Sequence, residues 1–498
     1  MLYLLLLVFS ANLLLELHAQ QICDIWQTTW DRTNLFNSVG QCGAPIDFTT
    51  PGSLADANII VNDGNVHQSI VGFGGSLTDS SATVLSNLKS SNAGQYNALL
   101  NTLFDPTDGA NAAGFSYVRI PIGASDFSAT TYSLDDTTGD DSFAQFNANR
   151  TPSQVFSVLQ DIVDINPQLK IHILPWSPPA WMKNSNTMDG GSLDANLTTA
   201  YPTYLLNAVK SYASMGFTVY AVSIQNEPEN SDTTYPSATM TAAVEAQIGT
   251  ALRTLLDNND LSSVKIIGYE HNWNDAAGYP VSLMESAPDA FDGVAFHCYE
   301  GTVAEQAQFS SQFPSKEIYF TECSGTIGSD WWSDIKWYMD NLWVGALEYG
   351  AMSGLMWNLA LDGSGNPILP GTDSCGGGCR GIVTVNGGSY TLNQEFYSMA
   401  QASKAIIPKD AGGPFGQRID VSVNGSLNSA LTVGAYATAR VDSSDWTRYS
   451  LVVLNSNDNS STTFNPVPVK ASIEFRGMQA VYTFPVGVTT LWWFAPAS

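Results

Sequence analysis

The sequence has little positive charge: 19 Lys and Arg residues stand against 46 Asp and Glu residues in 498, a formal net charge of -27. Such a chain is repelled by nucleic acid and by anionic membrane surfaces. We therefore expect no nucleic-acid partner and a substrate that is neutral or cationic. A second interpretation is that the acidity serves only solubility in an acidic medium.

Metal-binding patterns are also scarce. The chain has five histidines without a His-x-x-x-His pair, and its six cysteines lack paired Cys-x-x-Cys spacing. We expect neither a metal nor a cofactor. Two pairs that are close in sequence are candidate disulfides in an oxidising compartment: Cys23–Cys42 and Cys375–Cys379. Cys298 and Cys323 can pair or stay as buried thiols, and we favour free thiols.

A long apolar run occurs only at the N-terminus. The apolar run within residues 1–19 is too short for a membrane span. It ends near the small residue Ala19, which suits cleavage of a signal peptide, although the basic residues that usually begin one are missing. We therefore expect a secreted, extracellular protein with no membrane span, and we assume a monomer. Four Asn-X-Ser/Thr sequons are candidate glycosylation sites: Asn149, Asn196, Asn424 and Asn459.

A repeating pattern fills the middle of the chain, where short β-rich runs alternate with stretches of helical character. The runs cover residues 70–79, 116–127, 170–179, 219–228, 265–273, 293–301, 316–325 and 354–362. Two clear helical stretches are residues 151–166 and 238–259. Eight β/α repeats predict a parallel (β/α)8 barrel over residues 70–405, with a doubly wound sheet carrying extra strands as the alternative.

The pattern changes after about residue 405. Runs rich in β-branched residues follow one another with turn residues between them and no helical stretch. These features predict an antiparallel β-sandwich over residues 406–498, packed beside the barrel. We expect the β-like segment within residues 20–69 to join it.

Two glutamates lie at the ends of the fourth and seventh runs: Glu227 within Asn-Glu-Pro, and Glu322. Functional groups of a (β/α)8 barrel gather at the C-terminal ends of its strands, and runs four and seven lie on opposite sides of the ring. Two facing carboxylates suffice for glycoside hydrolysis. The alternatives are a helix cap or surface carboxylate for Glu227 and a buried ion pair with Arg119 for Glu322. We expect the charge of Glu322 to raise the pKa of Glu227, and Arg119 to keep Glu322 ionised.

At these residues the sequence resembles glycoside hydrolase family 30, which includes lysosomal glucosylceramidase and fungal endo-β-1,6-glucanases. The matching segments are GFGGSLTDSSA (72–82), RIPIGASDFS (119–128), PWSPPAWMK (175–183), QNEPEN (225–230), FHCYEG (296–301), FTECSG (320–325) and WNLALD (357–362). The resemblance implies a retaining mechanism, with carboxyl groups about 5–5.5 Å apart. It also implies a barrel with a side β-sandwich.

The resemblance further implies roles for single residues. Glu227 corresponds to the acid/base and Glu322 to the nucleophile, while Asn226 binds the sugar 2-hydroxyl. The remaining implied site residues are Arg119 and Tyr299, which support the nucleophile, Asp126, Trp176 and Trp357, which hold the sugar in the −1 subsite, and His297, which lines the cleft.

The sequence is most similar to the fungal β-1,6-glucanases, so we expect a polysaccharide or oligosaccharide substrate of that linkage. The alternatives are a β-glucosidase acting on glucosylceramide or small β-glucosides, a β-xylanase or xylosidase, and a non-catalytic carbohydrate-binding protein. Trp331 and Trp332, after the seventh run, are candidates for positive subsites, or else pack in the core under the next helix. The segment CGGGCRG (375–381) is a candidate wall of the cleft.

Overall fold

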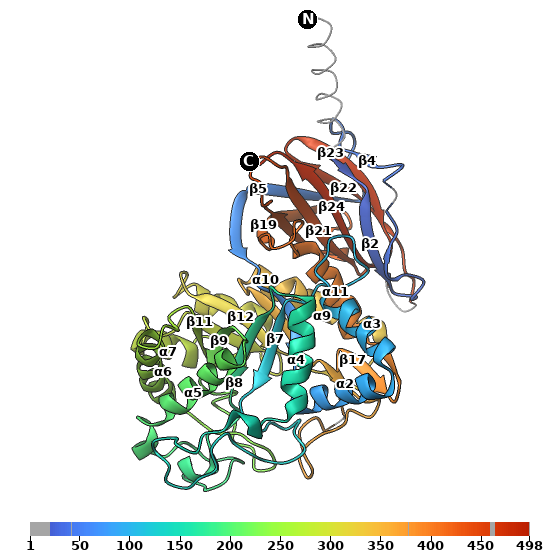
Figure 1. Cartoon of the computed structure of the whole chain (residues 1–498). Helices are drawn as coiled ribbons and strands as arrows, with labels where there is room; N and C mark the ends of the chain where they lie inside the picture. The colour runs from blue at the N-terminus through green and yellow to red at the C-terminus, as the bar shows by residue number, and fades with distance from the viewer. Residues whose placement is uncertain (1–19, 41, 377, 459–463, 498) are drawn as a thin grey trace, which may run out of the picture.

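Each of the eight predicted β-rich runs contains or overlaps one strand of a parallel barrel in the computed structural model (Figure 1). The structure describes residues 20–40, 42–376, 378–458 and 464–497, so the predicted signal peptide lies outside the described residues. In chain order the barrel strands are β6 (Gly72–Ser76), β7 (Tyr117–Pro121), β8 (Lys170–Leu174), β9 (Val219–Ser223), β10 (Lys265–Asn272), β11 (Gly293–His297), β12 (Glu317–Glu322) and β14 (Ser353–Asn358). Their residues are almost all buried, as expected for parallel strands covered on both faces.

The ring closes between β12 and β14. The N–H of Met352 donates to the carbonyl of Ile318 at 2.8 Å, and the N–H of Trp357 donates to the carbonyl of Cys323 at 2.7 Å. The other seven neighbouring pairs follow the chain from β6 to β12 and join β14 to β6. The prediction of a barrel is therefore confirmed, and the doubly wound alternative is wrong.

Helices surround the barrel where the sequence has helical periodicity. The longer ones are α2 (Asp79–Ser91), α3 (Ala93–Phe104), α4 (Ser153–Ile165), α5 (Tyr201–Ser214), α6 (Ala242–Asp257), α7 (Tyr279–Ser286), α9 (Trp331–Tyr338) and α11 (Gln394–Ile406), with the short α8 (Gln306–Ser310) and α10 (Gly345–Glu348). In α4, Val155, Val158, Leu159 and Ile162 form one buried stripe. The helix predicted from residue 238 begins only at 242, because Thr241 is its N-cap, with an extended backbone and a side chain that accepts from the N–H of Val244.

A nine-stranded sheet packs beside the barrel. Its order is β23 (Met478–Phe484), β22 (Val469–Phe475), β5 (Ala57–Ser69), β19 (Gln417–Gly425), β20 (Leu431–Thr438), β21 (Thr447–Asn455), β24 (Gly487–Ala495), β2 (Asp24–Thr29) and β3 (Leu35–Ser38). Only the β22–β5 pair is parallel. Phe475 on β22 lies 4.8 Å from Tyr449 and 5.3 Å from Trp493, ring centre to ring centre, although β21 and β24 are distant from β22 in the sheet order. The sheet therefore folds over its own apolar face as a sandwich.

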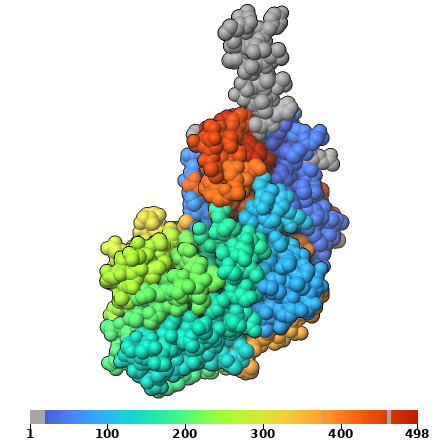
Figure 2. Space-filling model, viewed as in Figure 1, coloured from blue at the N-terminus to red at the C-terminus, as the bar shows by residue number. Residues whose placement is uncertain are grey.

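Helix α11 joins the two parts of the molecule. Thr490 on β24 donates to the side-chain oxygen of Gln401 at 2.6 Å, and Ser450 on β21 donates to the carbonyl of Ala405 at 2.7 Å. In the space-filling view, residues from both ends of the chain gather in the upper part of the molecule, directly against the barrel (Figure 2). No helix in the described ranges has the length and apolarity needed to cross a membrane.

Candidate active site

Glu227 and Glu322 meet across the mouth of the barrel. Glu322 is the last residue of β12, and Glu227 lies in the loop that follows β9. A carboxylate oxygen of one lies within 4.8 Å of a carboxylate oxygen of the other. Carboxyl groups about 5–5.5 Å apart fit a retaining glycosidase, whereas inverting enzymes need about 6.5–9.5 Å to admit a water molecule. The geometry therefore allows both carboxylates to act on one sugar from opposite sides.

The backbone holds Glu227 in an unusual conformation. Its φ angle is 47°, in the left-handed region, and its N–H donates to the carbonyl of Glu270 at 3.0 Å. Two side chains hold its carboxylate: His297 Nδ1 lies 3.1 Å from Oε1, and Asn230 Nδ2 donates to Oε2 at 3.2 Å. A non-glycine residue in this region is strained and is kept there by its surroundings. The carboxylate orientation is therefore fixed by both backbone and side chains.

Glu322 is held by a cation on one oxygen and a phenol on the other. Arg119 Nη1 donates to Oε2 at 2.5 Å, and the Tyr299 hydroxyl donates to Oε1 at 2.9 Å. Arg119 is fully buried, lies over the ring of Trp176 at 4.8 Å, and also donates to Asn226 Oδ1 at 2.6 Å. Each of the two carboxylate oxygens thus has a fixed donor.

Glu270 is the buried centre of the network, and the sequence interpretation gave it no role. Its carboxylate receives 3.1 Å contacts from Arg119 Nη2 and His297 Nε2, and it accepts from Thr321 at 2.6 Å and Ser223 at 2.8 Å. Tyr269 and Glu270 both have positive φ angles, and the register of β10 against β11 shifts there. This bulge explains how the Glu270 side chain reaches the barrel interior, since bulges re-aim side chains. The only sequence signal was an acidic residue near the end of a β-rich run.

The charges around His297 affect the pKa values of both Glu227 and Glu322. Although burial lowers its pKa, the neighbouring carboxylates Glu322, Glu227 and Glu270 raise the pKa of His297 to about 9. Burial raises the pKa of Glu227, but the bond and charge of His297 outweigh it, so the pKa of Glu227 is lowered. Burial raises the pKa of Glu322 in spite of His297 and Arg119. The expectation of a raised pKa for Glu227 is therefore wrong, because the sequence did not place a cationic imidazole against it.

A cavity of about 360 Å³ opens at the carboxylate pair. It is lined by Asp126, Trp176, Asn226, Glu227, Tyr235, Tyr299, Glu322, Ser324, Gly325, Thr326, Trp357, Ser374, Cys375, Gly376, Gly378 and Cys379. Trp176 and Trp357 stack with ring centres 4.6 Å apart. Burial raises the pKa of Asp126 to about 7, and its buried Oδ1 has no protein partner. An aromatic end with an unsatisfied carboxyl oxygen suits a neutral, hydroxyl-rich ligand.

Glu227, His297 and Glu322 also bring three potential metal ligands together in the described part of the chain. All three are engaged in hydrogen bonds, with one another or with Arg119, Tyr299 and Glu270. Acetal cleavage by a carboxylate pair proceeds without a metal.

The comparison with known families agrees with this geometry. Residues 70–369 match the glycosyl hydrolase family 30 TIM-barrel domain. The chain belongs to glycoside hydrolase family 30. The matched residues include all eight barrel strands, both members of the carboxylate pair, and Trp176 and Trp357.

Two proteins of known name and one solved structure illustrate what this chain is similar to. An endo-1,6-β-D-glucanase of Neurospora crassa is 34% identical over 385 residues, covering 72% of this chain and 76% of its own. An endo-1,6-β-D-glucanase of Aspergillus fumigatus is 33% identical, covering 72% and 75%. A solved endo-β1,6-glucanase structure superposes with a TM-score of 0.79 at 26% identity, covering 94% of this chain and 99% of that one.

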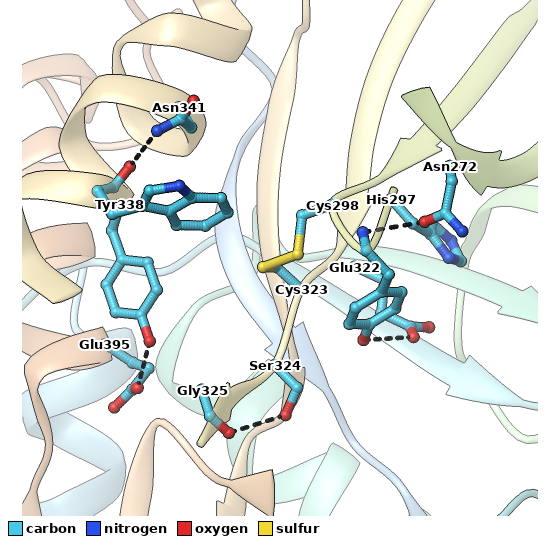
Figure 3. The surroundings of a disulfide bond; sticks show 12 residues. Asn272, His297, Cys298, Glu322, Cys323, Ser324, Gly325, Tyr338, Asn341 and Glu395 are labelled. Atoms are coloured by element: carbon cyan, nitrogen blue, oxygen red, sulfur yellow. Dashed lines mark hydrogen bonds between the residues drawn. A yellow bond between two sulfur atoms is a disulfide. The ribbon is translucent and has the colours of Figure 1, made fainter. Parts of the chain in front are cut away.

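Three disulfides are formed in this family 30 chain. Two join the pairs favoured by the sequence, Cys23–Cys42 and Cys375–Cys379. The third joins Cys298 to Cys323, so the expectation of free thiols there is wrong. Figure 3 shows this bond linking the chain beside His297 to the chain beside Glu322. Because β11 and β12 are neighbours in the barrel, the residues that follow them lie side by side, with Cα atoms 5.3 Å apart.

Trp331 and Trp332, candidates for positive subsites or for packing, both make packing contacts. Trp332 is buried, and its Nε1 donates to Asp458 at 2.6 Å. Trp331 packs edge-on against Tyr397 at 5.4 Å and lies under Arg32. Neither lines the catalytic cavity. These rings pack between α9 and the segments around it. The sequence of the seventh β-rich run alone does not reveal these packing partners.

His297 also differs from the expectation, because it is fully buried behind Glu227 and does not line the cleft. The glycine-rich segment does form part of the cavity wall, through Cys375, Gly376, Gly378 and Cys379. Of the sequons, Asn149, Asn196 and Asn424 are exposed, and Asn459 lies outside the described residues.

Proposed function

We propose that this retaining glycosidase cleaves β-1,6-linked glucan by double displacement, with Glu227 as acid/base and Glu322 as nucleophile. The observation that carries the mechanism is the approach of the two carboxylates to within 4.8 Å. The linkage is supported by the names of the relatives, since two that are at least 33% identical are endo-1,6-β-D-glucanases.

In the first step, Glu322 attacks the anomeric carbon while Glu227 gives its proton to the departing glycosidic oxygen. The C1–O bond breaks, and a covalent glycosyl ester forms on Glu322. Arg119 and Tyr299 hold the nucleophile in place, and both lower its pKa against the effect of burial until the bond forms. A sugar that displaces water from the cavity increases the burial of Glu227, which favours its protonated form.

In the second step, Glu227 acts as a base. It takes a proton from a water molecule, the oxygen attacks C1, and Glu322 leaves as a carboxylate. Two inversions give net retention of configuration. Asn226 accepts from Arg119 through Oδ1, which leaves its Nδ2 as a donor for the sugar 2-hydroxyl. Asp126, Trp176 and Trp357 line the same cavity as the carboxylate pair and form the −1 subsite.

Product analysis tests the substrate assignment. Wild-type enzyme is incubated with pustulan (a linear β-1,6-glucan), glucosylceramide and xylan under matched conditions, and Glu322→Gln enzyme is the control. We expect short β-1,6-oligomers from pustulan and no turnover of the other two. Release of ceramide or xylose as the main activity would replace the glucan assignment. Binding of pustulan without turnover would favour a non-catalytic carbohydrate-binding protein.

The organisation of the chain is also a proposal. Residues 1–19 act as a signal peptide, residues 70–405 form the catalytic barrel, and residues 20–69 and 406–498 build the sandwich. The positions of β5, which ends at Ser69, and α11, which ends at Ile406, support these boundaries. Three disulfides support export to an oxidising environment. We propose a secreted monomer glycosylated at its exposed sequons.

A further inference from the structure

A line of hydrogen bonds crosses the interior of the barrel and ends beside the carboxylate pair. Tyr117 Oη lies 3.2 Å from His172 Nδ1, and His172 Nε2 lies 2.7 Å from Ser223 Oγ. Ser223 donates to Glu270 Oε1 at 2.8 Å, and Glu270 Oε2 contacts His297. Tyr117, His172 and Ser223 lie on β7, β8 and β9, which are successive neighbours in the ring (Figure 1). We call these three residues the core chain.

The core chain is completely enclosed by the barrel. Tyr117, His172 and Ser223 each have 0% of their surface exposed. Polar side chains that are buried this deeply cost stability unless each one is hydrogen-bonded. The two displacement steps use none of the three side chains, although the line of contacts leads to the residues that hold the acid/base. The core chain therefore needs an explanation other than apolar packing.

Glu270 sets the direction of the hydrogen bonds. Burial raises its pKa, but the charge of Arg119 and the bond from His297 outweigh burial, so the pKa of Glu270 lies well below its ordinary value. An ionised carboxylate only accepts hydrogen bonds. The Ser223 hydroxyl therefore donates its proton to Glu270, and the Ser223 oxygen accepts in turn from the Nε2–H of His172.

His172 is neutral and carries its proton on Nε2. Burial lowers its pKa to about 4, and of the charged groups that face it, Glu270 on β10 opposes this effect and Arg119 on β7 strengthens it. A neutral imidazole with a proton on Nε2 has an acceptor at Nδ1. The hydroxyl of Tyr117 donates to that nitrogen. All donors of the core chain therefore point toward Glu270, an alignment in which each bond strengthens the next.

The core chain determines how the carboxylate of Glu270 is turned. Ser223 Oγ lies 2.8 Å from Oε1, and His172 Nε2 lies 3.3 Å from the same oxygen. The other oxygen, Oε2, lies 3.1 Å from both Arg119 Nη2 and His297 Nε2. Because the carboxylate is rigid, fixing Oε1 also fixes the place of Oε2 between the guanidinium and the imidazole.

Of these two neighbours, His297 depends more on Glu270. Arg119 is anchored separately by its 2.5 Å bond to Glu322. The ring of His297 is held at Nε2 by Glu270 and at Nδ1 by Glu227, with 3.1 Å on each side. A turn of the Glu270 carboxylate therefore moves the ring that fixes the acid/base.

We propose that the core chain, with His172 at its centre, positions the acid/base by orienting Glu270 and, through it, His297. His172 is thus a positioning residue, which acts through other side chains. The proposal rests on the proposed function, since it takes Glu227 as the acid. The expected defect on breaking the core chain is confined to proton transfer by the acid/base, because the nucleophile keeps its own donors.

Two substitutions of His172 separate positioning from packing. His172→Leu fills the space and removes both nitrogens, whereas His172→Gln keeps an N–H donor for Ser223. On pustulan, we expect His172→Leu to lower kcat about tenfold with KM changed less than about twofold, and His172→Gln to stay within about threefold of the wild-type kcat. Ser223→Ala should behave like His172→Leu. Its matched control is Ser353→Ala, a buried barrel serine that donates to the carbonyl of Phe320, and this variant should leave kcat unchanged.

An activated substrate locates the defect. The leaving group of 2,4-dinitrophenyl β-gentiobioside needs little protonation, so the glycosylation burst of His172→Leu should stay within about twofold of the wild-type rate. Equal losses on pustulan and on this substrate would overturn the proposal. Equal kcat values of His172→Leu and His172→Gln on pustulan would overturn it as well.

Nitrogen NMR tests the proton order without a substrate. In enzyme with 15N-labelled histidine, the His172 signals are those missing from His172→Gln. We expect a neutral ring with its proton on Nε2 from pH 6 to pH 8, and an Nδ1 signal that moves downfield in Tyr117→Phe, because that nitrogen loses its donor. A proton on Nδ1 would overturn the proposal. If wild-type enzyme does not cleave pustulan, the β-1,6-glucan assignment fails, while the spectra and the same variants on the glycan that is cleaved still decide the role of His172.

Discussion

Glu227 and Glu322 lie 95 positions apart in the sequence, yet their carboxylate oxygens approach to within 4.8 Å at the mouth of the barrel. The approach follows from the fold, because β9 and β12 are three strands apart in an eight-stranded ring, so residues after them can face each other across its mouth. Each carboxylate has its own donors, His297 and Asn230 for Glu227, Arg119 and Tyr299 for Glu322. The two groups therefore keep different roles while sharing one sugar.

Replacing Glu227 should affect substrates according to their leaving group. Glu227→Gln removes the proton donor, so we expect kcat/KM on pustulan to fall by about 10²–10⁴-fold. A 2,4-dinitrophenyl β-gentiobioside needs little protonation of its leaving group, so its glycosylation step should be nearly unchanged in a pre-steady-state burst. Similar losses on both substrates would exclude Glu227 as the acid.

Replacing Glu270 should move the pH profile as well as lower activity. Glu270 raises the pKa of His297, whose charge in turn lowers the pKa of Glu227. Glu270→Gln therefore makes His297 less cationic and lets Glu227 keep its proton to higher pH. We expect the basic limb of kcat/KM to shift upward in pH, measured from pH 3 to 9. A variant with lower thermal stability and an unshifted profile would mean that Glu270 has only a structural role.

The stability that three buried acids contribute should fall between about pH 4 and pH 8. Burial raises the pKa of Asp79 to about 6 and those of Asp126 and Glu245 to about 7. The folded state therefore holds these protons more tightly than the unfolded state, so the stabilisation is complete below the ordinary pKa of about 4 and is lost as the pH rises through 6–7. His297, with its pKa raised to about 9, acts in the same direction at higher pH.

Glu245→Gln provides the check on this pH dependence. The residue is fully buried in α6, and its Oε2 has no partner. The difference in unfolding free energy between pH 4 and pH 8, measured by urea titration, should be smaller in the variant than in the wild type by roughly 2–3 kcal/mol. We expect kcat to be unchanged. An unchanged slope would contradict the assignment of this proton to Glu245.

The Cys298–Cys323 disulfide should matter for catalysis and not only for stability. It joins residues next to Tyr299 and Glu322, whose side chains must stay 2.9 Å apart. We expect Cys298→Ser/Cys323→Ser to lower kcat about tenfold with a small change in KM, in addition to a loss of roughly 2–4 kcal/mol in stability. The control is Cys23→Ser/Cys42→Ser, at the sandwich, which should lose stability alone. Equal kcat values for the two double variants would refute the positioning role.

Much of the fold could be predicted because parallel barrel strands are buried on both faces, so each strand appears in the sequence as a short apolar run. Glu322 ends one such run, and Glu227 lies shortly beyond another. The barrel topology then predicted that both residues lie at the mouth of the ring. Glu270 was missed because a β-bulge turns its side chain inward, and periodicity does not reveal a bulge. The Cys298–Cys323 pair could have been found from the same topology, since successive barrel strands are neighbours.

The packing role of Trp332 could not be read from local sequence, because its partner Asp458 lies 126 positions away. The prediction of a raised pKa for Glu227 was wrong for a related reason. The sequence suggested Glu322 as its electrostatic neighbour, whereas the nearest charge is that of His297, from another strand. Contacts between distant segments decide both features.

Trapping the covalent intermediate tests the central claim most directly. The enzyme is treated with 2-deoxy-2-fluoro-β-gentiobiosyl fluoride, which slows hydrolysis of the glycosyl ester, and is then digested at low pH for peptide mass analysis. We predict that the peptide containing Glu322 gains the mass of one fluorinated disaccharide, and that Glu322→Gln enzyme gains none. A label on any other residue, Glu227 included, would contradict the account.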